Sequence, residues 1–228
     1  NQRFPPERQR LKQMIDAGRL GHIYHAEAIW LRRTGIPRIG SWFTQKRYAG
    51  GGCCYDIGVH MLDLCLHLIG EFDAVSVSGQ TYAEFGPRGL GNGGWGRSEI
   101  DPKAPFDVED FAVGLIRLRS GRTVILRVSW AGHMTENSNE NVILYGTEAG
   151  AMIRPPQIYY QGRKEYQIEP IKPGRPTVTP NRMAHFVDCV LGKAEPYVKP
   201  EESLQVQRIL DALYRSAQIG REVRLSTP

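Results

Sequence analysis

Cysteine is scarce in this sequence, and its placement excludes a disulfide framework. Only four of the 228 residues are Cys; Cys53, Cys54 and Cys65 crowd one segment, and Cys189 stands alone. Small proteins that depend on disulfides carry several spaced pairs of cysteines instead. We therefore expect this protein to occupy a reducing compartment, the cytoplasm.

The sequence also lacks segments that would direct it into a membrane or out of the cell. No apolar run reaches the length of a membrane span, and no secretory signal peptide is present. We therefore expect no membrane partner. The first residue is Asn1 rather than Met, which leads us to expect a fragment of a longer protein.

Acidic residues are rare in the first 50 positions, which hold ten Lys and Arg but only three Asp and Glu, whereas the whole chain has a net charge of +5. Solvated helix and loop faces explain such an excess. A basic rim facing an anionic ligand, such as a dinucleotide or an acidic sugar, is the alternative explanation. Because the chain has no helix-turn-helix, zinc-finger or RNA-binding aromatic pattern, we expect no nucleic-acid partner.

A nucleotide-binding turn is missing as well. The nearest approach to one, GLGNGG at 89–94, does not follow a strand and open a helix, so it is not a dinucleotide fingerprint. The elements predicted below leave no length of chain for a nucleotide-binding βαβ unit. Any dinucleotide must therefore be bound mainly by something outside these 228 residues.

The most informative segment that is present is 49–70, AGGGCCYDIGVHMLDLCLHLIG. From Asp56 onward, apolar residues cover nearly every side of the predicted helix, which is typical of a helix buried on most sides. At about 100° per residue, Asp56, His60, Asp63 and His67 fall in one stripe. Buried carboxylates and imidazoles must be paired or face a polar cavity. The three glycines just before the helix allow another backbone or a ligand to come close.

The stripe has three interpretations: an active site, a structural hydrogen-bond network or a metal site. All three remain open, and we favour the active site. Cys53 lies one turn before Asp56 on the same face, and an Asp/His pair four residues apart can chelate a metal ion. No Cys-x-x-Cys or His-Glu-x-x-His accompanies it. We therefore expect no metal.

The remaining pattern predicts an α+β fold with a large, mostly antiparallel open β-sheet and helices packed on one face. Apolar stripes at helical spacing predict helices over 5–18, 56–70, 183–191 and 200–219. Runs of β-branched and aromatic residues predict strands over 22–31, 73–85, 108–119, 122–131, 141–145, 151–154, 157–161, 164–168 and 223–225. Two long irregular stretches, 32–48 and 86–105, are predicted loops, and the first is expected to form a wall of the pocket at the glycines.

In order along the chain, several pieces resemble the Gfo/Idh/MocA oxidoreductases, and in particular their C-terminal domain. The most specific piece is GGGCCYDIGVHMLDL; the others are NQRF, DAGRLGHIYHAEA, WLRRTGIPRIGSWF, VEDFAVGLIRLRSG, YGTEAGAM and ILDALYRSAQIGREVRL. The resemblance implies that residues 1–228 form the substrate-binding and oligomerisation domain. It also implies a preceding Rossmann domain that binds NAD or NADP and is absent from this chain.

The resemblance further implies roles for individual residues. His60 would be the general acid or base on a substrate hydroxyl, and Asp56 would orient the substrate and tune that proton transfer. We expect the substrate-binding residues to include Asp63, Trp30, Arg32, Trp42, Lys46 and His133, and the cofactor contacts to include Asn1 and Arg3. The open sheet face would pair with another subunit, giving a dimer or tetramer.

The sequence therefore predicts the catalytic half of an NAD(P)-dependent dehydrogenase that acts on a sugar, a polyol or a related secondary alcohol, a half that is inactive alone. Two other functions remain open. One is a non-catalytic sugar-binding or assembly module. The other is a metal-dependent sugar hydrolase or isomerase that uses Asp56, His60 and Cys53.

Overall fold

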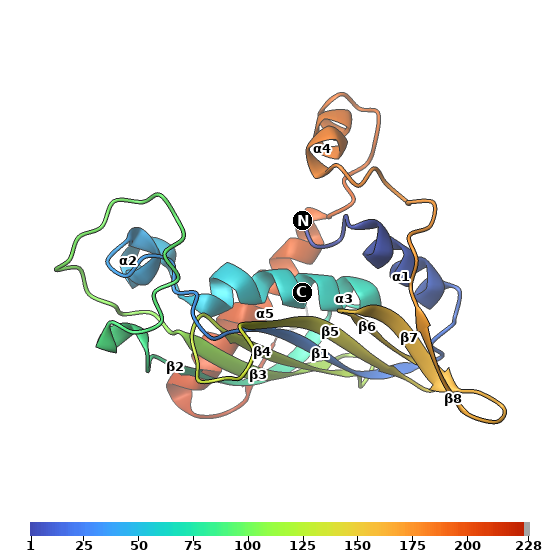
Figure 1. Ribbon diagram of the computed structural model, residues 1–228, viewed down its shortest axis with the longest axis horizontal. Helices are drawn as coiled ribbons and strands as arrows, with labels where there is room; N and C mark the ends of the chain where they lie inside the picture. Colours follow the sequence, from blue (N-terminus) through green and yellow to red (C-terminus); the bar gives the residue numbers. More distant parts are fainter. Residues whose placement is uncertain (226–228) are drawn as a thin grey trace.

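The computed structural model describes residues 1–225 and has one nine-stranded sheet with helices against it (Figure 1). The predicted α+β fold is confirmed. The helices are α1 (Pro6–Asp16), α2 (Lys46–Ala49), α3 (Val59–Ile69), α4 (Arg182–Val190) and α5 (Pro200–Ile219). The strands are β1 (Ile23–Arg32), β2 (Ala74–Tyr82), β3 (Phe111–Leu118), β4 (Thr123–Ser129), β5 (Ser138–Gly146), β6 (Gly150–Ile153), β7 (Pro156–Gln161), β8 (Tyr166–Pro170) and β9 (Val223–Arg224).

The sheet is antiparallel except at its centre. Its strands run in the order β8-β7-β6-β5-β1-β4-β3-β2-β9, and β1 lies parallel to β4. The predicted turn at Ser120 and Gly121 joins β3 to β4, and Gly121 has a φ of 90°, which a glycine adopts without strain. The strands β2 to β4 and β5 to β8 follow chain order, so neighbours in sequence are neighbours in the sheet within each run, and β1 lies between the two runs.

Helices α1 and α3 lie on the same side of the sheet (Figure 1). Helix α3 packs on β1 and β5, and α5 packs on β2 and against α3. The strand residues beneath them are small: Ala26 and Ala28 are fully buried in β1, and Leu213 of α5 presses on Gly79 and Gly114. Close approach of the helices to the sheet follows from these small side chains.

The central helix differs from the prediction in two respects. It does not start as a regular α-helix at Asp56, because Cys54–Gly58 forms a π-helical turn that precedes α3. The helical stretch Lys46–Ile69 is also long and apolar enough to cross a membrane by length and composition, with a mean hydropathy of 1.2, contrary to the expectation that no segment would be. About two thirds of its most apolar window (67%) is buried inside the protein, as in the core helix of a soluble protein.

The two predicted loops lie side by side at one end of α3, where Figure 1 draws the 86–107 loop around α2. Backbone hydrogen bonds join them: the N–H groups of Gly35 and Ile36 donate to the carbonyl of Gly91 at 3.1 and 2.9 Å. These hydrogen bonds join the two loops into one layer of irregular structure at this end of the molecule.

Candidate active site

Asp56 lies in the π-helical turn and is held by an indole. Its Oδ2 accepts a 2.8 Å hydrogen bond from Nε1 of Trp130, a fully buried residue that follows β4. Burial raises the pKa of the Asp56 carboxyl, and the Trp130 hydrogen bond and the nearby Arg32 and His60 oppose this rise. Trp130 received no role from the sequence; an aromatic residue just after a predicted strand gives no signal that its N–H reaches a carboxylate.

His60 follows one turn later, half-buried at the start of α3. Within residues 1–225 its ring makes no hydrogen bond; it lies 6.4 Å from the ring of Trp30, centroid to centroid. Burial lowers the pKa of His60, and the charge of Arg32 lowers it further, while Asp56 and Asp63 oppose the shift. The imidazole is therefore neutral at neutral pH and has a nitrogen lone pair available to accept a proton.

Arg32 completes this group. Its guanidinium carbon lies 4.6 Å from the ring centroid of Trp30, and its charge acts on Asp56 and His60. Asn1, Trp30, Arg32, Asp56 and His60 were all predicted site residues, and the structure brings them together around the start of α3.

Asp63 and Arg3, by contrast, are engaged with each other. Nε and Nη2 of Arg3 donate to the two carboxylate oxygens of Asp63 at 2.9 and 2.5 Å, and Nη1 bonds to Glu202 of α5. Arg3 is only 1% exposed. The cluster ties the start of the chain to α3 and α5. Substrate contact by Asp63 and cofactor contact by Arg3 stay predictions, and either contact would have to compete with this ion pair.

His67, the last member of the stripe, has a separate environment. Its Nε2 lies 3.2 Å from the hydroxyl of Tyr197, whose ring meets it edge-on. Burial lowers the pKa of His67 to about 3, with help from the charges of Arg3 and Lys12. The stripe therefore consists of four polar groups with four different sets of neighbours.

The glycines before the helix accommodate protein rather than ligand. A Cβ on Gly52 would lie 1.9 Å from the carbonyl oxygen of Glu109, and one on Gly51 would lie 2.2 Å from the hydroxyl of Tyr214. The buried carboxylate of Glu109 accepts hydrogen bonds from the N–H groups of Gly52 and Cys54, at 2.9 to 3.0 Å, and from Tyr214 at 2.7 Å. A carboxylate at a helix start is favourable because it satisfies unpaired N–H groups there.

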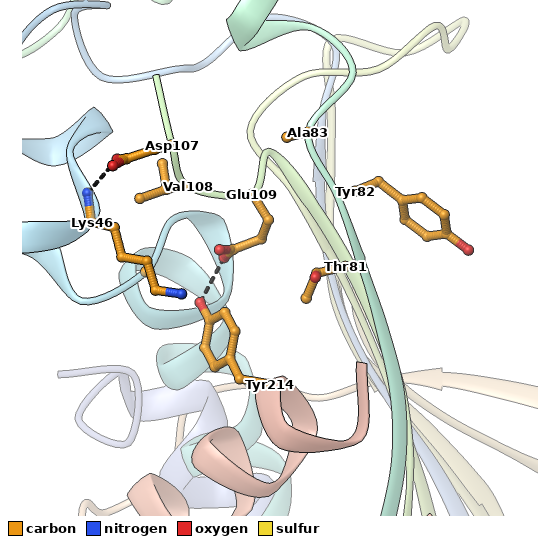
Figure 2. A pocket seen from close by; sticks show the side chains of 9 residues that line it. Lys46, Thr81, Tyr82, Ala83, Asp107, Val108, Glu109 and Tyr214 are labelled. Carbon is orange, nitrogen blue, oxygen red and sulfur yellow. Dashed lines mark hydrogen bonds between the residues drawn. The ribbon is translucent and has the colours of Figure 1, made fainter. Parts of the chain in front are cut away.

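A cavity of about 310 Å³ lies beside this contact, and Figure 2 shows the Lys46 side chain extending toward Tyr214 and Glu109. The Lys46 backbone N–H donates to Asp107 at 2.6 Å. Lys46 therefore lines a cavity at Glu109, on which Asp56 and His60 do not border.

The two remaining predicted substrate residues lie on the loops. Trp42 is 45% exposed and stacks on Phe43 at 3.9 Å between ring centroids. His133 follows Trp130 and meets Phe85 edge-on at 5.0 Å. Within residues 1–225 neither makes a hydrogen bond or a ring contact with Asp56 or His60, so their roles as substrate contacts stay predictions.

No group of three or more His, Cys, Asp and Glu side chains among residues 1–225 is arranged to hold a metal ion. Cys53, the candidate third ligand, is fully buried, and its Sγ faces the carbonyl oxygen of Val128 at 3.7 Å. Burial raises the pKa of its thiol, so the thiolate that a metal needs is disfavoured.

An open, mostly antiparallel sheet covered by helices defines the class of the fold, α+β, which solved dehydrogenases share. A family model described as "GFO/IDH/MocA C-terminal domain" matches residues 8–152. The chain belongs to this family.

Several known proteins are similar to this chain. D-glucoside 3-dehydrogenase of Escherichia coli (strain K12) is 35% identical over 98% of this chain and 62% of its own length. Levoglucosan dehydrogenase of Pseudarthrobacter phenanthrenivorans is 28% identical over 74% of this chain and 43% of its own length. A solved levoglucosan dehydrogenase in complex with NADH and levoglucosan has a TM-score of 0.78 at 20% identity, covering 98% of this chain and 64% of that one. This chain thus spans less than two thirds of these relatives.

Proposed function

We propose that this chain is the catalytic and substrate-binding domain, residues 1–228, of an NAD(P)-dependent dehydrogenase that oxidises a secondary hydroxyl of a sugar or polyol. The observation that carries the proposal is the pairing of Asp56 with His60 at the start of α3. The imidazole there is half-buried, neutral and without a hydrogen-bond partner among residues 1–225. The names of the relatives, a glucoside and a levoglucosan dehydrogenase, support it.

In this proposal His60 accepts the proton of the substrate hydroxyl. Its lowered pKa leaves the base form populated at neutral pH, and the carboxylate of Asp56 stabilises the imidazolium as it forms. Trp130 holds Asp56 in place through one oxygen, so the other oxygen remains for a second substrate hydroxyl. Trp30 and Arg32 border the same surface, and we retain them as substrate contacts.

The nicotinamide, when bound, supplies the hydride acceptor. Asn1 fits a place beside it, because Asn1 is exposed and its backbone nitrogen lies near His60. Arg3 fits less well, since its donors are occupied by Asp63 and Glu202.

A preceding nucleotide-binding domain is part of the proposal. Helix α4 supports it: Met183, Phe186 and Val190 are at least 63% exposed, an apolar face without a cover in residues 1–225, and Figure 1 shows α4 standing apart from the sheet near the N-terminus. Large exposed apolar patches mark interaction surfaces. The relatives exceed this chain by more than a third of their length, enough for such a domain.

We further propose that the protein is a homo-oligomer, a dimer or tetramer, in the cytoplasm. The sheet face away from α3 presents partly exposed Val113, Leu115, Ile125 and Ile143 beside a polar group of Glu27, Arg127 and Tyr145. The four cysteines are free thiols, as is usual in a reducing compartment.

The test of this function is the reduction of NAD and of NADP by the full-length protein in the presence of methyl glucosides, levoglucosan and polyols. We expect turnover of at least one sugar with one nucleotide, and loss of that turnover in His60→Ala. A full-length protein that binds sugars but reduces neither nucleotide would favour the assembly module instead.

A further inference from the structure

Arg32 has an unusual environment for a cation next to a catalytic pair. Its guanidinium lies between two indole rings, 4.6 Å from the centroid of Trp30 and 5.9 Å from that of Trp95. Within residues 1–225 none of its side-chain N–H groups has a hydrogen-bond acceptor. Arg32 is half-buried, and burial lowers its pKa while the charges of Asp56 and Glu140 oppose the shift. A guanidinium in this state favours an incoming ligand that carries oxygen acceptors.

The aromatic row continues beyond Arg32. The ring of Phe43 meets Trp95 edge-on at 5.6 Å and stacks on Trp42 at 3.9 Å. Trp42 and Trp95 remain 45% and 37% exposed, although both are large apolar rings. The row therefore forms an apolar surface that leads from Asp56 and His60 outward along the two loops.

Hydrogen bonds to backbone carbonyl groups hold this surface in place. Nε1 of Trp95 donates to the carbonyl of Gly35 at 2.9 Å, which fixes the indole against the first loop. Nη1 of Arg38 donates to the carbonyl of Ser98 at 3.1 Å, and the N–H of Asp101 donates to the carbonyl of Gly40 at the same distance. A preorganised surface loses little conformational entropy when it binds a ligand.

A cavity of about 450 Å³ opens beside Trp42 at the outer end of the row. Gln45, Glu99 and Asp101 line it together with Trp42. A pyranose ring presents C–H groups on its faces and hydroxyl groups around its rim. An indole face with carboxylates and an amide beside it matches both parts of such a ring.

We propose that Arg32, Trp95, Phe43 and Trp42 form a subsite for a second sugar ring, so that the preferred substrate is a disaccharide or longer saccharide rather than a monosaccharide. The ring that is oxidised lies at His60, the second ring lies along the indoles, and Arg32 donates to oxygens between them. The inference rests on the proposed function, because it assigns that same site a larger substrate.

The experiment compares kcat/KM of the full-length protein for maltose and cellobiose with that for methyl α- and β-D-glucoside. We expect at least one disaccharide to exceed its methyl glucoside about 10-fold. Trp95→Ala should lower this ratio by about 2- to 10-fold, the range expected for loss of one stacking partner, and Trp95→Phe should recover part of it. Tyr166→Ala, an exposed aromatic of β8, is the matched control and should leave the ratio unchanged. The melting temperatures of all variants serve as a control: a variant that lowers the ratio without lowering its melting temperature has lost the subsite and not the fold.

Equal kcat/KM values for disaccharides and methyl glucosides would overturn the subsite, as would a ratio that Trp95→Ala does not change. Phenyl glucoside turned over as well as the best disaccharide would show that the occupant need not be a sugar, which also contradicts the proposal. If no glucoside reduces either nucleotide, the proposed function fails first. In that case, titration of the tryptophan fluorescence with maltose and cellobiose still decides the subsite, because only binding that weakens in Trp95→Ala supports it.

Discussion

The indole N–H of Trp130 donates a 2.8 Å hydrogen bond to the carboxylate of Asp56. Trp130 follows β4, whereas Asp56 lies in the π-helical turn before α3. The bond therefore fixes the start of the helix against the end of the central strands. It also counteracts the rise in the pKa of Asp56 that burial causes, which favours the ionised carboxylate next to His60.

His60→Ala should lower kcat of the full-length protein far more than it weakens substrate binding. The expected loss is about 10²- to 10⁴-fold, the usual contribution of a general base. His67→Ala is the control on the same helix: it should lower the melting temperature, because the hydroxyl of Tyr197 loses its partner, and leave turnover per folded molecule nearly intact. Near-normal kcat in His60→Ala would mean that the stripe is structural.

The pH profile of kcat/KM should report the lowered pKa of His60. Because the neutral imidazole is the active form, activity should rise with pH and reach half of its maximum below the ordinary His value of about 6.5. Asp56 raises the pKa of His60, so Asp56→Asn should slow turnover and move this limb to still lower pH. A limb that stays in place in Asp56→Asn would show that the two groups are not coupled.

His67 should make the fold sensitive to mild acid. Its pKa is about 3 in the folded protein and about 6.5 in the unfolded chain. Between about pH 6.5 and pH 3, therefore, His67 is protonated in the unfolded chain and neutral in the folded protein. Stability should therefore fall by about 1.4 kcal/mol per pH unit between those values through this group alone. Urea unfolding at pH 7, 6 and 5 should show a steeper decline for the wild type than for His67→Gln. Parallel declines would contradict the assignment.

Gly52→Ala should destabilise the protein by about 3 kcal/mol or more, because its Cβ would lie 1.9 Å from the carbonyl oxygen of Glu109, a backbone atom that cannot rotate away. Gly132→Ala is the matched control, since a Cβ there meets nothing within 4 Å and the backbone needs no positive φ. Urea midpoints measure both variants. Equal midpoints would mean that the segment adjusts around Gly52.

Leu115→Arg should convert an oligomer to a monomer. Leu115 lies opposite Ile125 of β4 on the sheet face away from α3, where an added charge could not be buried in an interface. Leu204→Arg, an exposed position of α5, is the control. Light scattering should give a smaller mass for Leu115→Arg only. A monomeric wild type at tens of micromolar would contradict the proposed use of this face.

The sequence predicted most of the elements because their patterns are local. The limits of α5, residues 200–219, agree with the prediction, since Pro200 suits the first turn and Gly220 adopts the left-handed conformation after the last. The turn at Gly121 was predicted for a similar reason. The π-helical turn was not predicted, because the apolar residues of 53–59 are compatible with an α-helical turn as well as with a π-helical turn.

The candidate site was predicted only where one helix carries it. Asp56 and His60 are four residues apart, so helical geometry alone places them together. Trp130 reaches Asp56, and Trp95 reaches Arg32, from distant segments, and no periodicity encodes such contacts. Arg3 and Asp63 were both expected to contact ligands because the sequence contained no indication that they pair with each other.

The parallel pairing of β1 with β4 has a consequence for how the chain folds. β1 spans residues 23–32, and its two neighbours in the sheet are β4 and β5, which begin at residues 123 and 138. The central strand is thus made first but cannot be paired until about a hundred further residues have left the ribosome. During that interval the apolar residues of β1 and α3 have no sheet to cover them. Long-range closure of this kind slows folding, and until it is complete the exposed apolar residues of β1 and α3 make the chain prone to aggregation.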